Sequence, residues 1–221
     1  MPRAAKGKKL IIFDLDGTLV NAYPAVTASV NHTLKELGFP KKSALEIKRN
    51  VGGGDRHLMA QFVGDAFADR AIKLYRPHHA KALLTGVKFL PGAKNLLIKL
   101  KRQGYLLAIA SNRPTRFTQS ILRVLGINKL FNQVLCADKA PKPKPHPGML
   151  WMIIKRLNVA KKDTFFVGDM TIDVNTGKRA GVKTVAVTTG SSSIKELKSL
   201  KPMAIIARIS LLEMIINKEL V

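Results

Sequence analysis

The alternation of short apolar segments with helical segments constrains the fold of this chain more than any other feature of its sequence. A buried β-strand is a short apolar run ended by polar residues, whereas a helix repeats its apolar residues every three to four positions. Strands are expected at residues 8–16, 105–111, 131–137, 164–169 and 182–190, with a further strand at 203–207. Helices are expected between and after them, at residues 93–104, 114–126, 146–159, 171–181, 193–200 and 209–220. Repeated strand–helix units predict an α/β fold, with a parallel sheet covered by helices on both faces.

The segment at residues 21–85 interrupts this alternation, because its periodic stretches are all helical. Apolar residues recur at helical spacing from Val26 to Leu37, and Gly38 is a typical helix stop. Further helices are expected at residues 43–51, 55–63 and 67–84. The sequence therefore predicts a Rossmann-like core formed by residues 1–20 and 86–221, with an all-helical domain at residues 21–85 inserted into it.

Polar residues follow the predicted strands at the points where ligands bind in open parallel sheets, outside the carboxyl ends of the strands. These residues are Asp14 and Asp16 after the first strand, Ser111 and Asn112 after the second, Lys144 after the third, and Asp169 and Asp173 after the fourth. Carboxylates at the end of an apolar strand are costly to desolvate unless a partner offsets their charge. We therefore expect these groups to meet at one edge of the sheet.

This set of side chains suits the transfer of a phosphoryl group. Clustered carboxylates provide the hard oxygen ligands that Mg²⁺ prefers. Lys144, Ser111 and the backbone amides around Gly17 and Thr18 can neutralise a phosphate. One carboxylate can act as the nucleophile and form an aspartyl-phosphate, and a second can act as the acid and base. Alternation along a strand places residues i and i+2 on one side, so we assign Asp14 as nucleophile and Asp16 as acid/base.

The motifs "DLDGT", Ser111, Lys144 and "GDMTID" occur in this order over the whole chain and resemble those of the haloacid dehalogenase superfamily of phosphatases. The helical insertion after the first motif resembles the cap domain of that superfamily. The segments "LVNAYPAV", "VGGGDRHL" and "VGDMTIDVNTGKRAGVKTVAVTTG" are most similar to the phosphoglycolate phosphatase branch. The resemblance implies Mg²⁺ held by Asp14, the carbonyl oxygen of Asp16 and Asp169, with Asp173 in support. It also implies phosphate binding by Gly17, Thr18, Ser111, Asn112 and Lys144.

Two assignments remain open at this point. Lys142 and Lys144 both precede a proline, and the run "KPHPGML" into a helix favours Lys144 as the phosphate ligand. Arg56 follows three glycines, Gly52–Gly54, which would let the backbone approach the site. Arg56 is therefore either a clamp for a substrate carboxylate or a surface cation.

Several other functions compete with a small-molecule phosphatase. A sugar phosphomutase, a pyrophosphatase or a nucleotidase could use the same core motifs. A haloacid dehalogenase is disfavoured, because its leaving halide takes no proton and would not need Asp16. The net charge of +24, from 38 Lys and Arg against 14 Asp and Glu, also keeps a nucleic-acid-binding protein as an alternative of a different class. The same charge favours a small anionic phosphate ester as the substrate.

The sequence also suggests a location in the cell. Its single cysteine, Cys136, cannot form an internal disulfide. The first apolar run, Leu10–Phe13, meets Asp14 too soon for a signal peptide, and no apolar run approaches the length of a membrane span. A cytoplasmic, soluble protein with no membrane partner is therefore expected, and its oligomeric state is left open.

Overall fold

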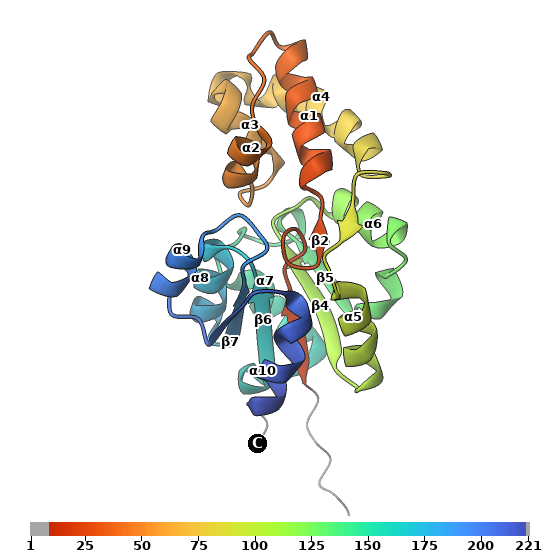
Figure 1. Ribbon diagram of the computed structural model, residues 1–221, viewed down its shortest axis with the longest axis vertical. Helices are drawn as coiled ribbons and strands as arrows, with labels where there is room; N and C mark the ends of the chain where they lie inside the picture. The colour runs from red at the N-terminus through yellow and green to blue at the C-terminus, as the bar shows by residue number, and fades with distance from the viewer. Residues whose placement is uncertain (1–8, 220–221) are drawn as a thin grey trace, which may run out of the picture.

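The computed structural model describes residues 9–219 as an α/β protein built on one six-stranded sheet (Figure 1). The strand order is β5-β4-β1-β6-β7-β8, and every pairing is parallel. The strands are β1 Leu10–Phe13, β4 Leu106–Ser111, β5 Gln133–Cys136, β6 Thr164–Gly168, β7 Lys183–Val187 and β8 Ala204–Ile206. The parallel sheet expected from the sequence is confirmed.

Helices cover both faces of this sheet. They are α5 Ala93–Arg102, α6 Thr115–Val124, α7 Gly148–Leu157, α8 Thr171–Ala180, α9 Ile194–Ser199 and α10 Leu212–Lys218, with 3₁₀ turns at Asn128–Leu130, Ala137–Lys139, Lys161–Asp163 and Ile209–Leu211. Alternate residues of β1 enter different apolar clusters: Ile11 and Phe13 pack with residues of α5, α6 and α10, whereas Leu10 and Ile12 pack with residues of α7 and α8. Burial on both faces explains why β1 is apolar throughout.

The register of the sheet brings the strand ends together. In β1, Phe13 is opposite Ile109 of β4 and Val167 of β6, and Ser111 of β4 is opposite Cys136 of β5. The loops that follow β1, β4, β5 and β6 therefore start side by side at one edge of the sheet. The candidate active site is built from these loops.

Four helices follow β1 and lie beyond this edge of the sheet, at the top of Figure 1. They are α1 Tyr23–Glu36, α2 Ala44–Asn50, α3 Asp55–Val63 and α4 Asp65–Ala82. They share an apolar cluster of their own, which includes Val30 and Leu34 of α1, Met59 of α3 and Ile72 of α4. We propose that residues 21–85 form a separate cap domain, because this cluster is distinct from the clusters of the sheet.

The connections between the cap segment and the sheet form an element that the sequence did not indicate. Strand β2 (Val20–Asn21), just before the cap helices, pairs with strand β3 (Lys88–Phe89), just after them, in an antiparallel ribbon. Strands of two residues are too short to show a hydrophobic period. The ribbon places the start and the end of the cap segment next to each other.

Some expected boundaries shift in the structure. The last cap helix begins at Asp65 rather than at residue 67, and the closing helix at 209–220 divides into a 3₁₀ turn and α10. The first eight residues, with Arg3, Lys6 and Lys8, and residues 220–221 lie outside the described residues. None of the helices within residues 9–219 is both long and apolar enough to span a bilayer.

Candidate active site

Asp14 stands at the end of β1, where the chain leaves the sheet. Its backbone amide still donates to the carbonyl of Val167 at 2.8 Å, which fixes Asp14 at the sheet edge. The chain then turns at Gly17, whose φ is +79°, and the Gly17 amide donates to Val20 at 2.8 Å. A Cβ on Gly17 would lie 2.6 Å from Oδ2 of Asp169. Glycine is therefore required here by its positive φ and by the close approach of a carboxylate.

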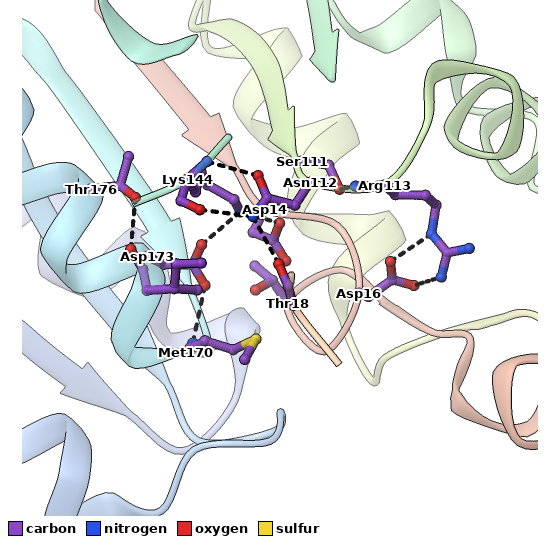
Figure 2. Close-up of polar contacts among 12 residues, drawn as sticks. Asp14, Asp16, Thr18, Ser111, Asn112, Arg113, Lys144, Met170, Asp173 and Thr176 are labelled. Atoms are coloured by element: carbon purple, nitrogen blue, oxygen red, sulfur yellow. Dashed lines mark hydrogen bonds and ion pairs between the residues drawn. The ribbon is translucent and has the colours of Figure 1, made fainter. Parts of the chain in front are cut away.

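Three buried carboxylates meet beneath this turn. Asp14, Asp169 and Asp173 each place one carboxylate oxygen within 4.8 Å of the others. Asp169 accepts hydrogen bonds from Thr18 Oγ1 at 2.8 Å and from the Ser191 amide at 3.2 Å. Asp173, in the first turn of α8, accepts from the Met170 amide at 3.0 Å (Figure 2). The carboxylates of Asp169 and Asp173 are thus held by hydrogen bonds from three different loops.

Lys144 joins two of these carboxylates. Figure 2 shows Lys144 in contact with both carboxylates. Its Nζ lies 2.5 Å from Oδ1 of Asp14 and 2.6 Å from Oδ1 of Asp173. Burial by itself would lower the pKa of Lys144, but the two carboxylates hold that pKa above its ordinary value. Lys144 is 4% exposed, whereas Lys142 is an exposed residue of the same loop. Of the two lysines considered from the sequence, Lys144 is the one that lies in the site.

The carboxylate cluster carries more negative charge than Lys144 can neutralise. Burial raises the pKa of Asp14 to about 7; Lys144 opposes this rise, and the charge of Asp173 adds to it. Burial, with the charges of Asp14 and Asp173, also raises the pKa of Asp169 well above its ordinary value. Within residues 9–219, Asp14 and Asp173 form ion pairs with Lys144 alone, and Asp169 forms none. An excess of negative charge on hard oxygen atoms fits a divalent metal ion.

The predicted phosphate ligands divide into two groups. Ser111 and Lys144 line a cavity at this edge of the sheet. Asn112 lines the same cavity, but its side chain is engaged with backbone: it donates to the carbonyls of Gly52 at 2.8 Å and Lys144 at 3.0 Å, and it accepts from the Lys144 amide at 2.8 Å. This side chain thus positions the Lys144 loop and links it to the cap segment.

Gly17 and Thr18 do not line the cavity, and both form hydrogen bonds with other residues of the protein. The Gly17 amide is bonded to Val20, and the Thr18 hydroxyl is bonded to Asp169. Their hydrogen bonds shape the turn after β1 and hold the Asp169 carboxylate. The Gly17 amide and the Thr18 hydroxyl thus help to build the site, and phosphate binding by the backbone amide of Thr18 stays a prediction.

The cavity has a volume of about 80 Å³ and lies between the sheet edge and the cap helices. Polar groups of the core line one side of it: Asp14, Asp16, Ser111, Arg113, Lys144 and Asp173. Residues of α1, α3 and α4 line the other: Val26, Leu58, Tyr75 and His79. Apolar side chains beside charged groups lower the local dielectric and strengthen electrostatic interactions between those groups.

Arg56 does not contribute to this cavity, contrary to the interpretation of Arg56 as a substrate clamp. Its side chain is 51% exposed, and its guanidinium pairs with Asp69 at 2.9 Å and Asp65 at 3.4 Å, both on α4. The arginine that lines the cavity is Arg113, which binds Asp16 through Nε at 2.7 Å and Nη2 at 2.9 Å. Arg113 directly follows Ser111 and Asn112 at the end of β4, so the rule that identified those two residues also covers it.

The loop after β7 is a second part of the site that sequence reasoning missed. Thr189 Oγ1 donates to the Gly17 carbonyl at 2.5 Å, and the Ser191 amide donates to Asp169. Gly190 packs against the Asp169 carboxylate so closely that no Cβ would fit. The available signal was the polar run "TTGSSS" at residues 188–193, which covers the end of the expected strand at 182–190 and the residues just after it.

Comparisons with known proteins agree with this geometry. Residues 11–187 match the model of the haloacid dehalogenase-like hydrolase family. A phosphoglycolate phosphatase of Pseudomonas putida is 31% identical over 207 residues, covering 90% of this chain and 76% of its own. A phosphoglycolate phosphatase of Haemophilus influenzae is 33% identical over 193 residues, covering 82% and 86%.

Solved structures show the same architecture. The crystal structure of a predicted phosphoglycolate phosphatase from Haemophilus somnus has a TM-score of 0.87 and 30% identity, and the match covers 96% of this chain and 99% of that one. The chain belongs to the haloacid dehalogenase-like hydrolase family. Within that family it is a phosphatase, and its buried aspartate cluster is compatible with a metal site.

Proposed function

We propose that this chain is a Mg²⁺-dependent phosphatase that hydrolyses phosphoglycolate through an aspartyl-phosphate intermediate. The observation that carries the proposal is the position of Asp14, which lies at a small cavity between Lys144 and the carboxylates of Asp169 and Asp173. A nucleophilic carboxylate needs cationic groups beside it when a negatively charged phosphate approaches. This arrangement provides one such cation and the ligands for another.

The carboxylate cluster is the proposed metal site. Asp14, Asp169 and Asp173 fit a Mg²⁺ ion by their hard oxygen atoms and by the negative charge that Lys144 leaves uncompensated, and the backbone carbonyl of Asp16 is a further proposed ligand. Mg²⁺ bound there would offset the repulsion between the phosphoryl oxygens and the Asp14 carboxylate. Thr18 and Ser191 hold the Asp169 carboxylate in place for this purpose.

The protein groups account for both halves of the reaction. A carboxylate oxygen of Asp14 attacks phosphorus, the ester P–O bond breaks, and Asp16 gives a proton to the departing alcohol oxygen. A water molecule then attacks the aspartyl-phosphate, Asp16 takes its proton, and inorganic phosphate leaves while Asp14 is regenerated. Ser111 and Lys144 donate hydrogen bonds to the phosphoryl oxygens in both halves.

Three observations support phosphoglycolate as the substrate. The relatives from P. putida and H. influenzae carry that name and match most of this chain. The cavity of about 80 Å³ favours a small molecule. The net charge of +24 favours an anion.

The test is phosphate release from phosphoglycolate and from a panel of sugar phosphates, nucleotides, pyrophosphate and 4-nitrophenyl phosphate. We expect the highest kcat/KM for phosphoglycolate, loss of turnover in excess chelator, and recovery with Mg²⁺. The Asp14→Asn variant is the control for a contaminating phosphatase. Full activity in excess chelator would overturn the proposal. A kcat/KM for a sugar phosphate or a nucleotide far above that for phosphoglycolate would overturn it as well.

A further inference from the structure

Arg113 is the positively charged group on the cavity wall that the reaction described above does not use. Its side chain is 10% exposed, and its Nε and Nη2 atoms donate to the two oxygens of Asp16 in a bidentate pair. Figure 2 shows that this pair directs the Asp16 carboxylate toward Arg113 and away from the cluster around Asp14 and Lys144. An acid/base held in this way is not directed at a phosphoryl group on Asp14.

The third nitrogen of Arg113 is held by the cap. Nη1 lies 2.6 Å from Nε2 of His79, and because a guanidinium only donates hydrogen bonds, Nε2 is the acceptor. Burial, together with the charge of Arg113, lowers the pKa of His79 to about 2. The ring is therefore neutral, and its proton is on Nδ1, which lies 3.2 Å from the hydroxyl of Ser29. Cap helices α4 and α1 thus fix the direction of the guanidinium without neutralising its charge.

We propose that Arg113 binds the carboxylate of the substrate in place of Asp16, and that this exchange releases the Asp16 carboxylate, which takes up a proton from solvent, toward the reacting phosphoryl group. The inference rests on the proposed function, whose substrate carries one carboxylate. A carboxylate on the substrate can take over both hydrogen bonds of the guanidinium, so the buried cation keeps a bidentate partner throughout. A phosphate ester without a carboxylate would leave Asp16 paired with Arg113. Otherwise the buried ion pair between Arg113 and Asp16 would have to break with no new partner for the guanidinium.

The position of Arg113 also fits the length of the proposed substrate. Arg113 is two residues from the phosphate ligand Ser111, and its own amide donates to Ser111 Oγ at 3.2 Å. Arg113 therefore follows Ser111 on one loop, and both residues line the same cavity. Phosphoglycolate has a single methylene between its phosphate ester oxygen and its carboxylate, so its two charged ends are also close.

The test compares phosphoglycolate with its neutral amide analogue, 2-(phosphonooxy)acetamide, as substrates. The measured quantity is the ratio of their kcat/KM values in the wild type, in Arg113→Gln and in Arg113→Lys. We expect the wild type to prefer phosphoglycolate, and Arg113→Gln to lower the ratio about 10- to 150-fold, the range for a lost hydrogen bond to a charged group. Arg113→Lys should give an intermediate ratio, because it keeps the charge and loses the planar bidentate geometry.

Arg56→Gln is the matched control, since Arg56 also pairs with two carboxylate oxygens but lies outside the cavity. Its ratio should equal that of the wild type. Binding of phosphoglycolate to Asp14→Asn and to the double variant Asp14→Asn/Arg113→Gln, measured by calorimetry, gives a readout that needs no turnover. We expect weaker binding by the double variant.

The outcomes separate this inference from the proposed function. If the wild type prefers phosphoglycolate and Arg113→Gln keeps that preference, Arg113 does not read the carboxylate and the proposed function stands. If the wild type hydrolyses phosphoglycolate and its amide analogue equally well, both this inference and the assignment of phosphoglycolate as the substrate fail. Thermal unfolding of each variant shows whether it is folded, and if Arg113→Gln is not, the ratio of Arg113→Lys decides in the same way.

Discussion

Replacing Lys144 by methionine tests the central arrangement of the site, because it removes the charge and keeps most of the aliphatic volume. Lys144 is 4% exposed and makes ion pairs of 2.5 and 2.6 Å with Asp14 and Asp173, which are themselves buried. Removing one partner of a buried ion pair costs roughly 3–5 kcal/mol of folding free energy. Protonation of Asp14, whose pKa burial already raises to about 7, relieves part of the repulsion. We therefore expect a loss of about 3 kcal/mol near neutral pH.

The same change should affect catalysis separately from stability. Loss of a preorganised donor to the transition state costs about 2–4 kcal/mol, or roughly 30- to 1,000-fold in kcat/KM. Mg²⁺ should return part of the lost stability, since a cation at the carboxylates replaces the missing charge.

The assays are denaturant unfolding in chelator and in Mg²⁺, and steady-state hydrolysis of phosphoglycolate. Lys142→Met is the matched control, because Lys142 is an exposed residue of the same loop. The reasoning would be refuted by equal losses in both variants, or by a Lys144→Met protein with wild-type stability and rate.

Three further predictions concern the turn after β1. Asp14→Asn should remove measurable turnover while the protein stays folded, because an amide does not form the acyl-phosphate. Hydrolysis of 4-nitrophenyl phosphate measures the turnover, and a circular dichroism melt measures the folding. Turnover near that of the wild type would contradict the prediction. Asp16→Asn should slow phosphoglycolate more than an aryl phosphate, since only an ester with a poor leaving group needs a proton; equal losses on phosphoglycolate and 4-nitrophenyl phosphate would argue against the acid role. Gly17→Ala should lower both stability and activity, because its Cβ would lie 2.6 Å from Asp169 and its φ is +79°; an unfolding midpoint and rate equal to the wild type would disprove that constraint.

The positions of the carboxylates could be predicted because they depend on backbone rules. Asp14 and Asp169 each follow a strand, and parallel register places the ends of β1 and β6 side by side. Asp173 lies in the first turn of the helix that begins just after Asp169. Strand ends and helix starts are visible in the hydrophobic pattern, so this part of the site follows from the sequence.

The hydrogen-bond partners of the site residues could not be predicted in the same way. Asn112 has the residue type of a phosphate ligand, but its side chain binds the backbone of Lys144 and Gly52. That choice depends on where the loop at Gly52 lies, and the packing of cap helices distant in sequence from Asn112 sets its position. The ribbon of β2 and β3 could not be predicted for a different reason. Each of its strands has two residues, which are too few to show a hydrophobic period.

The two arginines show why burial, rather than residue type, decides which cation can serve a substrate. Arg56 and Arg113 both pair with carboxylates at hydrogen-bond distance. The pair of Arg56 is exposed, where solvent screens the charges and the interaction adds little. The pair of Arg113 lies at a cavity covered by apolar cap residues, where a guanidinium needs a carboxylate partner at all times. A substrate carboxylate that replaces Asp16 would therefore gain more from Arg113 than from a surface cation, because solvent screens the charges less at this buried position.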